Sequence, residues 1–303
     1  MLDFSKIKTY SVKNRTHKEK LAKFPDVNDP IEIMDDKQLS ELAERIVAAF
    51  KNGKQVIFMM GGHVIKTGMA PFIIDLMKRG IIKHIATNGS TSIHDFEIAT
   101  IGETSEDVEA GIKNGSFGMV DETGRLMNEA INEGALKDLG YGFSIGKKIN
   151  DLNSDNKNNS VFYNAYKLEI PISVHVAIGN DTIHQHPRCD GSLLGKATYS
   201  DFKLLADSIG KMRDGVVVNI GSAVVLPETF LKALTIARNL GCNVENITAA
   251  NLDMNDHYRP RVNIVERPVK ALGGRGLVII GRHEKTIPSL YKLIISKLTH
   301  HLE

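Results

Sequence analysis

The stretch V-I-F-M-M-G-G, from Val56 to Gly62, decides the fold, because it is an apolar run that ends on a glycine pair. An uninterrupted apolar run of this length is typical of a strand buried on both faces of a sheet. The residues from Ile65 to Arg79 then have helical spacing, and Gly80 stands where a helix would end. The stretch predicts a buried strand, a glycine turn and a helix, which is the unit of a parallel α/β sheet.

The same unit recurs along the chain and predicts a doubly wound, mostly parallel sheet with helices on both faces. Residues 1–50 are expected to form an N-terminal helical extension, with its clearest helix over 37–51, and residues 51–301 a single α/β domain. We predict the other strands over residues 82–86, 172–178, 216–220, 246–250 and 277–280, and the other helices over 161–168, 198–213 and 227–240.

The composition narrows the class of protein. The chain has 303 residues, 42% of them hydrophobic and 24% charged, which is ordinary for a globular protein. Its net charge of +2 gives no electrostatic case for nucleic acid or a membrane surface as a partner. No apolar run approaches the ~20 residues that cross a bilayer. The cysteines Cys189 and Cys242 do not form a disulfide framework, which favours a reduced, cytoplasmic setting.

Polar and glycine residues gather where the predicted strands end. This matters because the ligand crevice of an open α/β sheet lies beyond the carboxyl ends of its strands. Gly61 and Gly62 either let a ligand approach the backbone closely or form a plain tight turn, and Gly221 and Ser222 leave the same alternatives. The polar strand ends are G-G-H at 61–63, T-N-G at 87–89, G-N-D at 179–181, G-S at 221–222 and A-N-L-D at 250–253.

The segment S-I-H-D-F-E, from Ser92 to Glu97, supplies two catalytic candidates just past a predicted strand end. His94 has a side chain that exchanges a proton near neutral pH, so it is a candidate general base. Asp95, the next residue in the sequence, is the second catalytic candidate. The alternative for Asp95 is structural, because aspartate is a favoured cap of a helix N-terminus.

The segment A-I-G-N-D-T-I-H-Q-H-P, from Ala177 to Pro187, contains an H-x-H pair formed by His184 and His186. Alternate residues of a strand share a face, so the two imidazoles and the upstream His175 could bind zinc. No H-E-x-x-H or C-x-x-C spacing supports a metal site. We therefore favour a polar pocket lining, with His184 and His186 as catalytic candidates and no bound metal.

The segment D-M-N-D-H-Y-R-P-R, which spans residues 253–261, is dense in charge after a predicted strand. Carboxylates and arginines in this arrangement suit the recognition of a charged substrate through charge-assisted hydrogen bonds. The alternative is an ordinary solvated loop. The candidate residues are Asp253, Asp256, His257 and Arg259.

Taken in order, these pieces resemble the deoxyhypusine synthase family over roughly residues 50–300. V-I-F-M-M-G-G-H-V-I-K-T-G looks like the family's strand, turn and helix with the first cofactor contacts, and I-A-T-N-G-S-T-S-I-H-D-F occupies the place of its second glycine turn. S-V-F-Y-N-A-Y-K-L-E-I-P-I is similar to its helix–strand unit, and V-V-N-I-G-S-A-V-V to its later glycine turn. N-I-T-A-A-N-L-D followed by Y-R-P-R is similar to the segment that leads to its active site.

The resemblance implies a doubly wound NAD-binding fold and a homotetramer with active sites at subunit interfaces. It also implies oxidation of spermidine with NAD and transfer of the aminobutyl group to a protein lysine through an imine on an enzyme lysine. Asn180 and Asp181 would hold ribose hydroxyls, while His184 and His186 would face the reactive end. The cofactor-binding residues would be Gly61, Gly62, His63, Thr87, Asn88, Gly89, Asn180, Asp181, Gly221, Ser222, Thr248 and Ala249.

The sequence departs from the family where the imine-forming lysine is expected. The residues 266–268 are Glu, Arg and Pro there, the chain has no tryptophan, and neither arginine nor proline offers the primary amine that an imine needs. Lys270 lies two residues on in a different frame, and we expect Lys270→Ala to be harmless to activity. His94 also replaces an acidic residue that would hold the polyamine cation, and Arg282-His283 replace an acidic residue and its small partner in a later cofactor loop.

The leading hypothesis is therefore a deoxyhypusine-synthase-like enzyme of unknown substrate, with an NAD crevice, that acts by hydride transfer on an amine-containing small molecule. His94 or His184 would be the base, and residues within 253–259 would orient the substrate. Three alternatives stay open at this point. They are an aminobutyl transferase acting on polyamines, a metal-dependent hydrolase built on His175, His184 and His186, and a catalytically silent nucleotide sensor.

Overall fold

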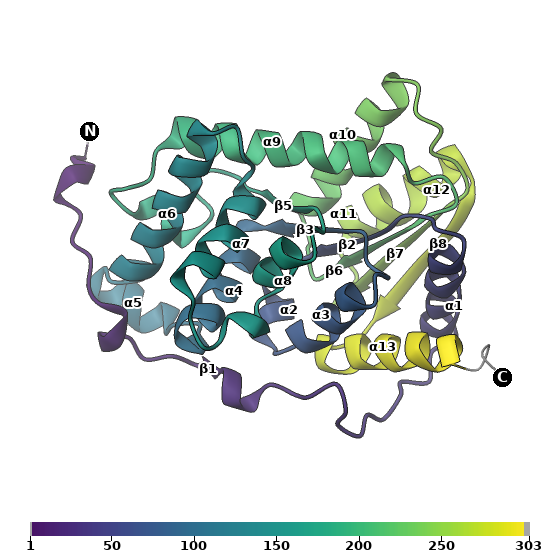
Figure 1. The fold of residues 1–303 in the computed structure, drawn as a ribbon, viewed down its shortest axis with the longest axis horizontal. Helices are drawn as coiled ribbons and strands as arrows, with labels where there is room; N and C mark the ends of the chain where they lie inside the picture. The colour runs from purple at the N-terminus through teal and green to yellow at the C-terminus, as the bar shows by residue number, and fades with distance from the viewer. Residues whose placement is uncertain (1, 300–303) are drawn as a thin grey trace.

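A parallel six-stranded sheet forms the centre of the computed structural model, which describes residues 2–299 (Figure 1). The strand order is β5-β3-β2-β6-β7-β8, and every neighbouring pair is parallel. The predicted parallel α/β sheet is confirmed. The strands are β2 (Val56–Met60), β3 (His84–Asn88), β5 (Ile172–His175), β6 (Val216–Ile220), β7 (Ile247–Asp253) and β8 (Gly274–Ile280).

This order places a topological switch between β2 and β6. The chain winds outward from β2 through β3 to β5, then returns to the other side of β2 and continues through β6, β7 and β8. Numbered along the sheet, this is the 3-2-1-4-5-6 order of doubly wound nucleotide-binding folds. A ligand crevice is expected outside the carboxyl ends of β2 and β6.

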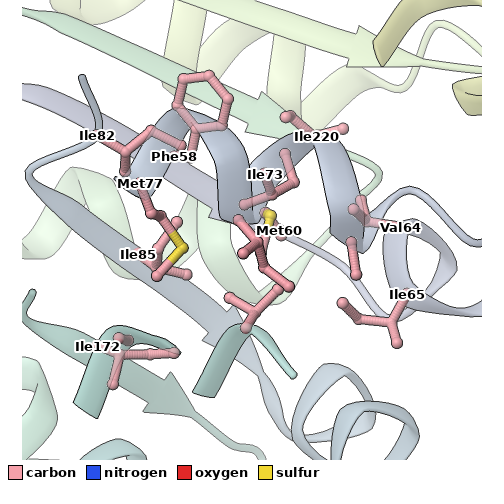
Figure 2. Close-up of a cluster of buried hydrophobic side chains, with 14 of the residues drawn as sticks. Phe58, Met60, Val64, Ile65, Ile73, Met77, Ile82, Ile85, Ile172 and Ile220 are labelled. Carbon is pink, nitrogen blue, oxygen red and sulfur yellow. The ribbon is translucent and has the colours of Figure 1, made fainter. Parts of the chain in front are cut away.

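Alternating side chains of the strands build two apolar layers. Phe58 and Met60 face one layer, whereas Ile57 and Met59 face the other. Figure 2 shows part of the first layer, where Phe58 and Met60 lie among side chains of the neighbouring strands and helices. Helices contribute buried side chains to both layers, which confirms the predicted helices on both faces of the sheet.

The first layer is covered by α1 (Lys37–Lys51), α2 (His63–Lys66), α3 (Ala70–Lys78), α4 (Gly89–Ile101), α6 (Asp121–Leu136), α7 (Tyr141–Leu152), α8 (Val161–Lys167) and α13 (His283–Thr299). The second is covered by α10 (Val225–Asn239), the π-helical segment η6 (Arg261–Glu266), α12 (Arg267–Leu272) and the C-terminal half of α9 (Gly191–Gly210). The predicted helix over 65–79 is instead two helices, because Gly68 adopts a positive φ of 81° and ends the first.

Residues 2–36, which we call the N-terminal strap, run along the outside of the molecule before α1 (Figure 1). The prediction of a helical extension is wrong here, since the strap has only short 3-10 turns and the strand β1 (Glu19–Lys20), which pairs with β4 (Glu103–Thr104). The Val12 amide donates to the Glu122 carboxylate at 2.7 Å and further anchors the strap. Only the helix over 37–51 forms as predicted.

The carboxyl ends of β2 and β6 lie backbone against backbone. A Cβ on Gly61 would lie 2.1 Å from the Gly221 carbonyl oxygen. We therefore expect Gly61→Ala to lower the free energy of unfolding by about 2–3 kcal/mol, because neither backbone can yield without disturbing the sheet. The measurement is chemical denaturation.

The matched control for this prediction is Gly191→Ala, at the first residue of α9. A Cβ there meets nothing within 4 Å, so the free energy of unfolding should stay the same or rise by less than about 1 kcal/mol. Equal stability of Gly61→Ala and the wild type would contradict the close approach.

Among residues 2–299, the apolar stretches of the helices all fall short of what crossing a membrane requires.

Candidate functional site

The carboxyl edge of the sheet collects most of the residues that the sequence nominates. Because the six strands of this sheet are all parallel, the segments that follow β2, β3, β5 and β6 emerge at this edge. Thr248 and Ala249 are the exception. Thr248 pairs with Val216, the first residue of β6, so these two residues lie at the amino end of the sheet and cannot line the same crevice as Gly221.

Gly62 and Gly89 lie at this edge where other protein atoms leave no room for a side chain. A Cβ on Gly89 would lie 2.0 Å from Asp181 Oδ2, and one on Gly62 would lie 2.6 Å from Ser90 Oγ and 3.2 Å from His94 Cδ2. The glycines therefore let Asp181 rest on the start of α4 and let the His94 ring rest on the start of α2. Asn88 caps α4 through its side chain, which accepts from the Thr91 amide at 3.1 Å.

A cavity of about 250 Å³ opens beside these contacts. The strap, α2, α4, the segment after β4 and the segment after β5 each contribute to its wall. Its polar and charged lining residues are Arg15, Lys66, Ser90, His94, Glu97, Ser105, Glu106, Asn180, Asp181 and Thr182. His94 and Asp181, which the sequence analysis selected separately, thus share one cavity.

A hydrogen-bond chain orients His94. The Thr104 hydroxyl donates to Glu97 Oε2 at 2.6 Å and also lies 2.8 Å from His94 Nδ1. Since that hydroxyl has one proton and gives it to the carboxylate, Nδ1 must carry the proton that joins it to Thr104. Nε2 then keeps its lone pair, and it forms no hydrogen bond within residues 2–299.

The strap completes this chain from outside the sheet. Arg15 Nη1 forms a buried ion pair of 2.8 Å with Glu97 Oε1, which also accepts from the Thr123 hydroxyl at 3.0 Å. The pairing of β1 with β4 places Thr104 in register with Glu19. The strap therefore holds both the carboxylate and the hydroxyl on which the tautomer of His94 depends.

Burial sets the protonation of the cavity side chains. Desolvation lowers the pKa of His94 to about 4, so His94 is neutral at physiological pH. Desolvation raises the pKa of Asp181 to about 6, and it also raises the pKa of Glu106. Asp181 and Glu106 are thus carboxylates that would gain from a cationic partner.

The charges around the cavity are incompletely paired. Arg15 is engaged by Glu97 and lies 4.0 Å from Glu106. Asp181 lies 3.8 Å from the His184 ring, whose pKa is lowered by burial, and Lys66 forms no ion pair within the described residues 2–299. The cavity therefore offers carboxylates for a cation and one ammonium for an anion.

Asp95 has a structural role, and its assignment as a catalytic candidate is wrong. It is completely buried and accepts from the backbone amides of Val161 at 2.8 Å and Phe162 at 3.2 Å, and from the Ser160 hydroxyl. These are the first residues of α8, so Asp95 caps a helix other than its own. It has no contact with the cavity.

His175, His184 and His186 do not come together. His175 Nε2 bonds the Ser173 hydroxyl at 2.9 Å inside the sheet, and His186 packs on Gly124. No group of three or more His, Cys, Asp or Glu side chains is placed to hold a metal ion in the part of the chain that the structure describes. The histidine cluster expected for a metal-dependent hydrolase is therefore wrong.

His184 is also unsuited to be a base. Its Nδ1 accepts from the amides of Gly179 at 3.1 Å and Asp181 at 3.3 Å, so the ring proton belongs on Nε2. Thr182–Gln185 forms a 3-10 turn rather than a strand, so the H-x-H side chains do not share a strand face. His184 supports the turn that carries Asp181.

The charged segment after β7 is mostly a solvated loop. Asp256 pairs with Arg261 at 2.5 Å, and Arg259 pairs with Glu228 at 3.4 Å. His257 lies between them at the start of the short helix α11 (Tyr258–Pro260). Asp253 differs, because it is buried at the end of β7, where its carboxylate accepts from the Met254 amide at 2.7 Å.

The switch point itself is bordered by His63, Gly221 and His283. The His283 ring is 1% exposed and so close to Gly221 that a Cβ there would lie 2.5 Å from Nε2, and its centroid is 6.1 Å from that of His63. Both His283 ring nitrogens and the buried Thr286 hydroxyl lack hydrogen-bond partners within residues 2–299. Buried polar groups are normally paired, so these atoms lack partners that a polar ligand at the switch point could supply.

The charged lining residues Arg15, Lys66 and Glu106 were not selected from the sequence, and neither was Thr104, which contacts His94 from behind the cavity wall. Glu97 was quoted only as part of the Ser92–Glu97 segment. No local signal marks Arg15, because it lies in the strap and reaches Glu97 across more than eighty residues of sequence. A helical spacing of three between His94 and Glu97 places both on one face of α4, and this was the signal available.

No known family model and no curated protein sequence matches the chain. Solved structures do share its fold. The chain superimposes on AgrE in ternary complex with ornithine and NAD⁺ with a TM-score of 0.54 and 13% identity, over 89% of this chain and 35% of that one. A LOR/SDH protein from Methanococcus maripaludis S2 gives a TM-score of 0.52 and 15% identity, over 90% and 74% of the two chains.

A protein described as a deoxyhypusine synthase from Entamoeba histolytica gives a TM-score of 0.52 and 12% identity, over 86% of this chain and 90% of that one. The chain spans about a third of the length of AgrE and of the arginine dihydrolase ArgZ, with coverages of 35% and 33%. Identities this low carry the fold and not the activity. The chain therefore has the α/β fold shared by deoxyhypusine-synthase-like and LOR/SDH-like proteins.

Proposed function

We propose that this chain is a nicotinamide-dinucleotide-dependent enzyme that oxidises an amine-bearing small molecule in the His94 cavity. The observation that carries the proposal is the chain Glu97–Thr104–His94, which leaves the lone pair of Nε2 free in a cavity that the Asp181 carboxylate also lines. The fold supports the nucleotide, since one structure with this fold holds ornithine and NAD⁺. It also supports a crevice at the switch between β2 and β6.

The residues of the cavity have complementary roles. Asp181 and Glu106 hold the substrate as an ammonium ion, through charge-assisted hydrogen bonds. The ammonium must lose a proton before hydride can leave the adjacent carbon, and His94 Nε2 accepts that proton. Because Glu97 faces Thr104, the positive charge that then develops on the imidazole is compensated through the Thr104 hydroxyl.

The nucleotide would lie at the switch point next to Gly62, where an added Cβ would lie 3.2 Å from the His94 ring. Gly61, Gly221, Ser222 and His283 border that place, and His63 covers it from α2. When bound, the nucleotide supplies the acceptor for the substrate hydride. Thr87, Asn88 and Gly89 would act indirectly, by setting the start of α4 from which Ser90 and His94 project.

The test combines binding and turnover. Purified full-length chain is titrated with oxidised and reduced nicotinamide dinucleotides in a thermal shift assay, where saturation at about 100 times the dissociation constant adds about 2.7 kcal/mol of stability. It is then incubated with nucleotide and spermidine, ornithine or lysine, and the reduced nicotinamide is followed by fluorescence. Nucleotide binding without oxidation of any amine would favour a silent nucleotide sensor.

Lys270→Ala is expected to leave both nucleotide affinity and amine oxidation unchanged. Lys270 is exposed on α12 and is not part of the cavity wall. A transferase mechanism through an enzyme imine would need such a primary amine within reach of the substrate. The measurement is the rate of amine oxidation by the variant, and an inactive but folded variant would revive the imine mechanism.

A homotetramer with sites shared between subunits, as the resemblance implies, belongs to this proposal, as does a cytoplasmic location. The support for the location is compositional, since Cys189 and Cys242 are free. Size-exclusion chromatography with light scattering measures the subunit number directly, and a monomer would remove the shared-site arrangement from the proposal.

A further inference from the structure

We infer that the nucleotide site prefers the phosphorylated dinucleotide NADP(H) over NAD(H), because the edge formed by β7, β8 and the start of α13 is built to receive a phosphate. This inference rests on the proposed function and specifies the cofactor of that same crevice. The residues that carry it are Arg282, His283 and Thr286.

The first observation is geometric. Gly281 follows β8, its amide donates to the Asp253 carbonyl at 2.9 Å, and α13 begins two residues later. The first turn of α13 therefore opens at the carboxyl edge, beside the end of β7. A helix of 17 residues presents free backbone N–H groups and the positive end of its dipole at this point.

The second observation is the set of unpaired polar groups at this turn. His283 is 1% exposed and Thr286 is fully buried, and neither side chain has a hydrogen-bond partner within residues 2–299. The His283 ring packs on Gly221, the residue that follows β6 at the carboxyl edge of the sheet, so that a Cβ on Gly221 would lie 2.5 Å from its Nε2. A neutral imidazole and a hydroxyl can each donate one hydrogen bond to an anion.

The third observation is charge. Arg282 is exposed, forms no ion pair in the part of the chain that the structure describes, and directly precedes the first turn. A ribose with a free 2′-hydroxyl is held by a carboxylate acceptor, whereas a 2′-phosphate is held by an arginine. Guanidinium, helix N–H, imidazole and hydroxyl together form a donor set, which suits the phosphate oxygens.

The acidic groups nearby are Asp253 and Glu284. Asp253 is buried and accepts from the Met254 amide, so it is already engaged within its own turn. Glu284 lies in the first turn and is exposed, so it is the residue that would hold a ribose hydroxyl if the site preferred NAD(H). The preference can therefore be tested by changing the charges of Arg282 and Glu284.

The experiment measures the dissociation constants of NADPH and NADH for the full-length chain by nucleotide fluorescence. We expect NADPH to bind roughly ten- to hundred-fold more tightly, as a charge-assisted contact provides. Arg282→Glu should remove this difference by weakening NADPH alone. The matched control Glu284→Gln, in the same exposed turn, removes a negative charge and should therefore not weaken NADPH binding.

Each outcome either supports or overturns the preference for NADP(H). Adenosine 2′,5′-bisphosphate should compete with NADPH better than AMP does, because the preference belongs to the adenosine half. Equal affinities for NADPH and NADH, or an Arg282→Glu variant that keeps the preference, would overturn this inference and leave the proposed function standing. Failure of both nucleotides to bind would overturn the proposed function as well.

Discussion

His94→Gln is expected to lower the rate constant of amine oxidation by about 10²–10⁴-fold, because it removes the proton acceptor of the reaction. His94 Nε2 is the acceptor that Thr104 and Glu97 leave free in the cavity. The glutamine keeps polarity and approximate size but offers no basic nitrogen. The loss should therefore appear in kcat, with little change in KM.

Two matched variants test whether the loss of kcat in His94→Gln comes from the missing proton acceptor. Thr104→Val keeps the shape of the side chain but removes the hydroxyl that fixes the His94 tautomer, so kcat should fall by less than in His94→Gln. His257→Gln changes a histidine outside the cavity and should leave kcat unaltered. If His94→Gln retains the wild-type kcat, the assignment of the base is wrong.

Asp181→Asn is expected to raise the KM for the amine by about ten- to hundred-fold, because a buried charged contact with an ammonium is lost. The carboxylate rests on Gly89 at the start of α4 and faces the cavity. The affinity for the nucleotide should not change. A loss of nucleotide affinity instead would support the ribose-binding role that the family resemblance implies.

The protonation of Asp181 adds a pH dependence to this result. Burial raises its pKa to about 6, and only the ionised form attracts the ammonium. Amine binding should therefore be complete above this pH and weaken as the pH falls through about 6. The neighbouring titratable groups are His184, Lys66, Glu106 and His94. In Asp181→Asn the contribution of Asp181 should disappear and only that of Glu106 should remain, which is measured as KM against pH.

The sheet was predictable because its strands are short apolar runs, and runs of this length are typical of strands buried on both faces of a sheet. Val56–Met60 and Val216–Ile220 are strands with the predicted limits. The end of β7 was not predictable from hydrophobicity, because the strand continues through Asn251 to Asp253. That extension moves Thr248 and Ala249 to the far end of the sheet.

The candidate site was predictable only in part. His94 and Asp181 could be found because each follows a strand end, where ligands of this fold class bind. Arg15 and Thr104 could not be found, since both depend on the pairing of β1 with β4, and such long-range pairing leaves no local pattern. Asp95 was misassigned because a buried cap of another helix has the same local sequence as a catalytic carboxylate.

The central claim is that one crevice at the carboxyl edge joins a nicotinamide dinucleotide to the His94 cavity. A crystal structure of the full-length chain with NADPH tests it most directly. We predict the nicotinamide near Gly62 and His94, and the adenosine phosphate at Arg282 and His283. A nucleotide bound elsewhere, or no nucleotide at saturating concentration, would contradict the account.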